Sequence, residues 1–213
     1  MGMDQAAYTA IFGGYDKLQA PTVAGRFVAY TGGQMCEGWE VWTSIPQADK
    51  RRTARQFKLL SFPAAESLWI DGNIALAVPV AEVLGVWFDG YDIALFKHPA
   101  GDCIYGEARR VVKKGKDWAE VVDAQMARYK AAGFPAHFGL GETCTMAKRD
   151  TPAVREFMAL WWAEIVKGSA RDQLSFDYVR WLMGDKVRVN MVSGGMGWRR
   201  RSHPWFVCRE HRA

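Results

Sequence analysis

The segment from Ser67 to Asn73 places the strongest constraint on the fold of this chain. It reads Ser-Leu-Trp-Ile-Asp-Gly-Asn, an apolar run that ends abruptly in a carboxylate, a glycine and an amide. The pattern predicts a buried strand that delivers Asp71 to the rim of a sheet, where open α/β folds bind their ligands. Asp71 and Asn73 are two residues apart, so in an extended backbone both side chains would project to the same side.

Two oxygen ligands on one side of the chain suit a hard divalent cation, Mn²⁺ or Mg²⁺, that carries a diphosphate. Gly72 between them would let the ligand approach the backbone closely. The alternative is a strand followed by an Asp-Gly turn, which is a common pattern in proteins. The segment by itself leaves both explanations open.

Length and composition limit the class of protein. We expect a single α/β domain over residues 1–213, because a chain of this length can bury a full core. The net charge of +5 favours an anionic substrate or a polyanionic partner. No apolar run approaches the roughly 20 residues of a membrane span. The 4 cysteines form no Cys-x-x-Cys pair, which argues against a disulfide framework and a zinc site and favours a cytoplasmic location.

Apolar runs separated by glycine pairs predict the elements of this domain. The expected strands are residues 8–12, 26–30, 40–42, 68–70 and 93–96. The expected helices are residues 53–60, part of 75–88, a helix from a capping box at Asp117 and Glu120 to Gly133, a helix from Pro152 to Gly168, and one from about Ser169 to Met183. Residues 184–213 are expected to form a basic tail or loop over the site. Neither a dinucleotide fingerprint nor a P-loop is present in the sequence.

Two segments in the first third of the chain could bind a nucleotide. Phe12 and Gly13 end the first expected strand before Tyr15, and a glycine there would let the backbone turn under a flat ring; a simple tight turn is the alternative. Arg55 and Lys58 share one face of the expected helix with a further arginine, Arg51. A basic face can hold a diphosphate or a nucleic acid backbone, but it can also be a solvated surface.

Three later segments are candidates as well. The stretch from His98 to Glu107 is not periodic and carries several polar side chains, which serve either a site or structural hydrogen bonds. Asp172 and Gln173 stand at a helix start and could face a substrate, or Asp172 could simply cap its own helix. His203 follows the basic run Arg199–Arg201 between aromatic residues and could be a metal ligand, the alternative being a basic tail.

Five segments in this order resemble the TOD/MUCI-type glycosyltransferase-like family of bacteria and plants, over about residues 8–180. They read YTAIFGGYD, SLWIDGN, FKHPAGDCIYGEA, AGFPAHFGLGET and WWAEIVKGSARDQLSF. The resemblance implies a GT-A fold, which is a nucleotide-binding α/β sandwich with a mixed central sheet. It also implies a UDP-sugar donor and a divalent cation. Asn73 stands where a second carboxylate is common in such folds, and Thr31-Gly32 replaces the Thr-Asp of many members.

The resemblance also implies roles for particular residues. Asp172 and Gln173 are expected to be catalytic, and Asp71, Asn73 and His203 to hold the metal. The residues expected to bind the donor are Phe12, Gly13, Tyr15, Arg55, Lys58, Asp71, Gly72, Asn73 and His98.

The function expected is transfer of a sugar from a nucleotide-sugar donor to a hydroxyl group. The acceptor would be a glycan or a hydroxylated base in DNA, where the basic charge would follow the phosphates. One alternative is a non-catalytic nucleic-acid-binding module. Another is a metal-dependent phosphate-ester hydrolase, with ions held by Asp71, His98, Asp102 and His203.

Overall fold

One mixed sheet of seven strands organises the residues that the structure, a computed structural model, describes: 4–99, 101–195 and 202–211. The strands lie in the order β3 (Glu40–Thr43), β2 (Phe27–Thr31), β1 (Gln5–Ile11), β4 (Glu66–Ile70), β7 (Gly141–Arg149), β6 (Ile93–Lys97) and β8 (Val189–Val192). All of them run parallel except β7, which is antiparallel to β4 and β6. The predicted α/β class with a mixed central sheet is confirmed.

A small antiparallel sheet stands beside the main one. It consists of β5 (Ile74–Leu76), β10 (Phe206–Cys208) and β9 (Ser202–His203). The region from residue 184 onward, expected as a tail or loop, thus contributes the short helix η1 (Gly184–Lys186) and three strands in its described parts. The basic run Arg199–Arg201 lies outside the described residues.

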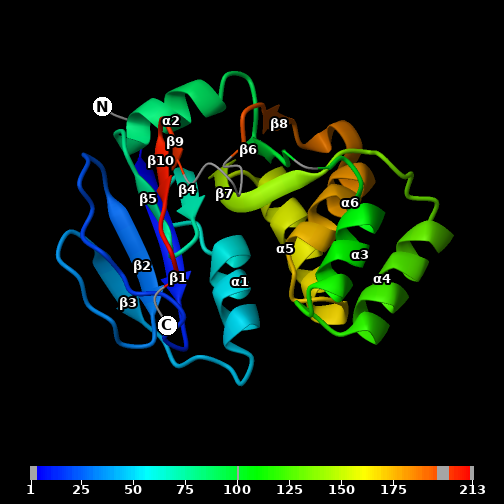
Figure 1. Cartoon of the computed structure of the whole chain (residues 1–213). Helices are drawn as coiled ribbons and strands as arrows, with labels where there is room; N and C mark the ends of the chain where they lie inside the picture. Colours follow the sequence, from blue (N-terminus) through cyan, green and yellow to red (C-terminus); the bar gives the residue numbers. More distant parts are fainter. Residues whose placement is uncertain (1–3, 100, 196–201, 212–213) are drawn as a thin grey trace.

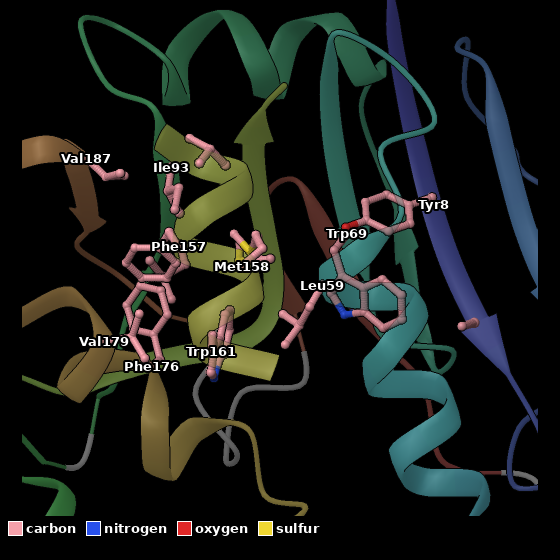
Figure 2. Packing of buried hydrophobic residues seen from close by; sticks show 14 of the residues in the cluster. Tyr8, Leu59, Trp69, Ile93, Phe157, Met158, Trp161, Phe176, Val179 and Val187 are labelled. Carbon is pink, nitrogen blue, oxygen red and sulfur yellow. The ribbon is translucent and has the colours of Figure 1, made fainter. Parts of the chain in front are cut away.

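Helices cover both faces of the main sheet. On one face, α1 (Lys50–Leu60), α5 (Pro152–Lys167) and α6 (Gln173–Met183) enclose a core that includes Trp69, Leu59 and Trp161 (Figure 2). On the other face, α2 (Val80–Trp87) packs on Leu68 and Ile70. The helices α3 (Ile104–Lys113) and α4 (Ala119–Ala131) gather with α5 and α6 on the right of Figure 1. Because β4 is buried along its whole length, its apolar residues serve both cores.

Most of the expected elements are present, with boundaries shifted by a few residues. Besides the elements after residue 183, the structure adds α3, β7 and the short strand β5, which the sequence did not predict. The predicted capping box at Asp117 is wrong, because α4 begins after Trp118 and Asp117 accepts a hydrogen bond from the Ser169 hydroxyl at 2.5 Å. The predicted helix start at Pro152 is confirmed, and Thr151 caps this helix by accepting from the Val154 amide at 3.2 Å.

The parallel strands bring several segments to one edge of the sheet. The carboxyl ends of β1, β4 and β6 lie at this edge, and so does the start of the antiparallel strand β7. Residues that follow Ile11, Ile70 and Lys97 in the chain therefore meet there, which is where open α/β sheets bind ligands. Among the described residues, no helix is long and apolar enough to cross a membrane.

Candidate functional site

Asp71 is held at the sheet edge by three interactions. Its amide donates to the Cys144 carbonyl at 2.9 Å, which extends the pairing of β4 with β7 by one residue. Its Oδ1 accepts from the Trp69 indole at 2.8 Å and lies 3.7 Å from Nη1 of Arg55. The carboxylate is thus oriented by Trp69 and Arg55, while 27% of its side chain remains exposed.

The backbone after Asp71 is a turn and is not extended. The Ile74 amide donates to the Asp71 carbonyl at 2.8 Å, which closes a four-residue turn. The premise that Asp71 and Asn73 project to one side of a strand is therefore wrong. The Asn73 amide group donates to the Arg209 carbonyl at 3.0 Å, so this residue ties the C-terminal segment to the turn.

Gly72 is required by close packing in this turn. A Cβ at this position would lie 2.9 Å from Cγ1 of Ile11 and 3.1 Å from Oδ2 of Asp16. The sequence predicted that a ligand would approach the backbone closely at Gly72. In the structure, the loop after β1 occupies that position. It brings a second carboxylate, Asp16, next to Asp71.

Asp16 and His211 complete this corner of the site, and the sequence did not assign a role to either. Nδ1 of His211 lies 2.9 Å from Oδ1 of Asp16, and its ring packs 4.6 Å from the Tyr15 ring. Burial and the nearby Asp71 charge raise the pKa of Asp16, and His211 opposes this shift. Contacts across 195 residues of chain leave no local signal in a sequence.

The basic face of α1 points inward. Asp49 caps this helix by accepting from the amides of Arg51 and Arg52 at 3.0 Å, which sets the rotation of the helix. Arg51 lies at the exposed start of the helix and donates to the Lys116 carbonyl, whereas Arg55 is 15% exposed and Lys58 is fully buried. The alternative of a solvated charged face therefore does not hold for Arg55 and Lys58.

Asp172 receives both of these cations. Its Oδ2 lies 2.5 Å from Nζ of Lys58 and 3.2 Å from Nε of Arg55. Burial alone would raise the pKa of this carboxyl, but the charges of Arg55 and Lys58 outweigh it and hold the pKa well below its usual range. The Lys58 ammonium also donates to the Thr143 carbonyl. Asp172 is therefore a fixed negative charge, and its side chain also accepts from the Gln173 amide at the start of α6.

Gln173 lies at the same edge of the sheet. Its Nε2 donates to the Gly141 carbonyl at 3.0 Å, and the Gly141 amide donates to Oδ2 of Asp177 at 2.8 Å. The start of β7 and the first turn of α6 are thus joined by two hydrogen bonds, which fix the position of the Gln173 side chain.

The three residues after β1 that were expected to bind the donor have different environments. Phe12 is buried and stacks on Phe57 at 5.4 Å, so it belongs to the core below the site. Gly13 has a φ of 77°, and a Cβ there would lie 2.6 Å from the Lys50 side chain. Tyr15 is 61% exposed. The glycine turn is therefore present, and the Lys50 side chain packs against it.

His98 and His203 stand apart from Asp71. His98 follows β6, two strands from β4, and burial lowers its pKa. His203 is paired with Phe206, which is paired with Leu76, and its ring packs against Phe96 at 4.9 Å. At about 3.3 Å per residue and about 4.8 Å between strands, this register puts His203 more than about 10 Å from Asn73. The structure therefore does not bring His203 and Asp71 together at one metal site.

The stretch from residue 98 to 107 was expected to be irregular, but its last residues form the start of α3. Tyr105 and Glu107 belong to α3, where the Tyr105 hydroxyl donates to the Phe134 carbonyl at 2.8 Å and Glu107 pairs with Arg110 at 2.8 Å. These two side chains therefore make structural hydrogen bonds, which was the alternative considered for them.

The acidic residues at the turn fit a divalent cation that takes its other ligands from a substrate. Among the described residues, no group of three or more His, Cys, Asp or Glu side chains forms a metal site. Mg²⁺, however, is commonly held by one or two carboxylates together with substrate phosphates. Asp71, with the exposed face described above, can serve in this way, and Asp16 adds negative charge beside it, whereas the Asn73 side chain is bound to the Arg209 carbonyl.

The comparison with known families decides what kind of domain this is. The model of the TOD1/MUCI70, glycosyltransferase-like domain matches residues 39–196, which include Arg55, Asp71 and Asp172. The chain belongs to this family. A curated protein of Arabidopsis thaliana, the probable hexosyltransferase MUCI70, is 30% identical over 187 residues, which is 80% of this chain. The chain spans 31% of the length of that relative.

Two solved structures have a distant likeness to this family member. The apo structure of the bifunctional glycosyltransferase WbbM overlaps 90% of the chain with 7% identity and a TM-score of 0.46, and the chain covers 39% of it. Mouse xyloside xylosyltransferase 1 in its apo form overlaps 89% of the chain with 7% identity and a TM-score of 0.41, and the chain covers 84% of it. We draw nothing further from either superposition.

Proposed function

We propose that this domain transfers a sugar from a uridine diphosphate sugar to a hydroxyl group of a glycan, with the help of Mn²⁺ or Mg²⁺. The observation that carries the proposal is that Asp71 and Asp172 both pair with the guanidinium of Arg55. The two carboxylates are 101 residues apart, counted from position 71 to position 172, and both lie in segments that resemble the family. One charged cluster at the ligand-binding edge of an α/β sheet is what a diphosphate-sugar site requires.

In the proposed reaction, the bond between the anomeric carbon and the diphosphate oxygen breaks and a bond to the acceptor oxygen forms. The proton of the acceptor hydroxyl passes to the departing diphosphate. Negative charge grows on the leaving β-phosphate, so positive groups fixed near it lower the barrier. Arg55 is such a group, since two carboxylates hold it at the edge of the sheet. A cation held by Asp71 would supply a second positive charge on the diphosphate.

Asp172 positions this machinery and does not act as the base. A carboxylate whose pKa lies well below its usual range takes up a proton too weakly near neutral pH. Its role in the proposal is to hold Arg55 and Lys58 in place, since its side chain is 3% exposed and both of its oxygens are engaged within the protein. Gln173, anchored to Gly141, orients the donor sugar from the first turn of α6.

The other candidate functions lose support. The hydrolase needs Asp102 and His98 close to Asp71, but Asp102 pairs with His137 at 2.9 Å on the exposed surface beyond β6. The DNA acceptor rests on the net charge of +5 and on the run Arg199–Arg201, which lies outside the described residues, so it has no observation of the structure to support it. Neither function accounts for the buried pairing of Arg55 and Lys58 with Asp172.

The test is release of UDP from a panel of UDP-sugars by the full chain, with and without Mn²⁺. Asp71→Asn is expected to lower the rate by about 100-fold, the scale of losing one fixed transition-state contact. Asp123→Asn is the matched control, since it removes a carboxylate from the exposed face of α4. Equal rates for wild type and Asp71→Asn, or no release from any UDP-sugar together with no stabilisation by UDP, would overturn the proposal.

A further inference from the structure

A second hollow opens away from the Asp71 site, between the start of α3 and the segment that follows α4. Its volume is about 560 Å³. Arg109 and Lys130 line it with exposed side chains, and the buried rings of Tyr105 and Phe134 form its floor, with His137 at its rim. No residue expected to bind the donor belongs to it.

The two cations of this hollow have no carboxylate partner among the described residues. Nζ of Lys130 lies 5.3 Å from the centroid of the Tyr105 ring, so the ammonium is held over an aromatic face. A side chain at Gly106 would come within 3.9 Å of the Arg109 guanidinium, which shows that Arg109 folds back over the first turn of α3. The nearby carboxylate of Asp102 is engaged by Nδ1 of His137 at 2.9 Å.

The wall of the hollow is fixed by the backbone. Among the described residues, His137 is the one residue other than glycine with a positive φ, at 61°. Such a conformation costs free energy and is found most often at functional sites, where surrounding contacts hold it. Here the Gly139 amide donates to the Asp102 carbonyl at 2.9 Å, and Tyr105 donates to the Phe134 carbonyl. The hollow is therefore formed before any ligand binds.

The hollow lies on the same edge of the sheet as the proposed reaction site. His137 is four residues before Gly141, whose carbonyl accepts from Gln173. Four residues of chain span at most about 14 Å. A ligand in the hollow can therefore belong to the same extended molecule as a group that reacts beside Gln173.

We propose that this hollow binds an anionic group, a carboxylate or a phosphate, carried by the acceptor glycan next to the unit that receives the sugar. Arg109 offers a planar pair of donors that matches either anion, and Lys130 adds a point charge. Assigning the anion to an acceptor rests on the proposed glycosyl transfer, whereas anion binding itself does not.

The first experiment measures binding to the full chain by NMR titration, with no donor present. The probes are methyl β-glucuronide, the neutral methyl β-glucoside and inorganic phosphate. Wild type is expected to bind one of the two anions, and Arg109→Gln/Lys130→Gln to bind it at least about tenfold more weakly. The control Lys113→Gln/Lys114→Gln removes the same charge from the far end of α3 and is expected to bind like wild type.

The outcomes separate this inference from the proposed function. Binding of the glucuronide alone identifies a carboxylate subsite, and binding of phosphate alone identifies a phosphate subsite. Equal binding of glucuronide and glucoside without phosphate binding, or equal weakening in both double variants, would overturn the inference. Anion binding that persists in a chain without UDP-sugar turnover would refute the proposed transfer and leave the anion site standing.

Discussion

Lys58 and Lys148 are both fully buried on the α1 face of the sheet, yet their charges meet different partners. Nζ of Lys58 lies 2.5 Å from Asp172 and faces the Trp69 ring at 5.4 Å. Nζ of Lys148 donates to the carbonyls of Lys58 and Leu59 at 3.0 and 2.9 Å, at the end of α1. One ammonium is part of a charged cluster at the sheet edge, and the other caps a helix C-terminus.

The two ammonium groups differ in whether a carboxylate lies beside them. Burial lowers the pKa of Lys148 well below its usual value. The two groups to which its ammonium donates in the bonds above are neutral carbonyls. Lys58, in contrast, shares a carboxylate with Arg55. Burial alone therefore does not identify a functional lysine, whereas the partner of its ammonium does. Four predictions test this contrast, from the largest expected effect to the smallest.

Lys58→Met is expected to lower the free energy of unfolding by about 3–5 kcal/mol, because it leaves the Asp172 carboxylate buried with one partner fewer. UDP release is expected to fall with it. Urea denaturation measures the first effect. Adding Asp172→Asn should recover part of the lost stability but no activity, and a single variant as stable as wild type would contradict the pairing.

Lys148→Met is expected to cost about 1–3 kcal/mol, since the carbonyls of Lys58 and Leu59 lose a buried donor while the methionine keeps the volume. UDP release per folded molecule should remain close to that of wild type. The comparison is made at a urea concentration where both proteins are folded. A loss of turnover as large as that of Lys58→Met would remove the distinction between the two lysines.

Acid should act through Asp172. Its pKa is lower in the folded protein than in the unfolded chain, so its contribution to stability is present above about pH 4, the ordinary range of Asp. That contribution is lost as pH falls from there towards the folded pKa. Asp172→Asn should therefore flatten the fall of the urea midpoint with acid, and an unchanged acid slope would count against a charged Asp172.

Alkali should act through Lys148, with the opposite sign. Its pKa is lower in the folded protein than the value of about 10.4 in the unfolded chain, so between the two values the unfolded state binds more protons. Stability therefore gains a contribution as pH rises through this window. The gain should be absent in Lys148→Met, and urea midpoints between about pH 7 and pH 9 measure it.

The sequence predicted which residues stand at the ends of strands and helices better than it predicted which of these residues contact one another. An apolar run before a carboxylate located Asp71, and a helix start located Asp172. That one arginine links them could not be predicted, because it depends on how α1 packs across the sheet. The strand β7 escaped prediction because buried polar residues such as Glu142 and Lys148 interrupt its apolar pattern.

The helix α3 and the contact of His211 with Asp16 were not predicted, for two other reasons. The N-cap of α3 is Cys103, which makes no side-chain capping bond, so the usual start signal is absent. Both His203 and His211 follow the same basic run. The sequence predicted the first at the metal and assigned no role to the second. The pairing of strands β10 and β5, which decides between them, joins residues more than 100 positions apart, as Phe206 and Leu76 show.

The attachment of the C-terminal segment has a consequence for how the protein matures. Arg209 and His211 contact Asn73 and Asp16, which a ribosome makes much earlier. The turn that carries Asp71 is therefore fully supported only after residues 209 and 211 have been made. A shortened version ending before Arg209 could assemble the main sheet and its helices while leaving this corner unfinished. Stability would then survive a truncation that substrate binding would not.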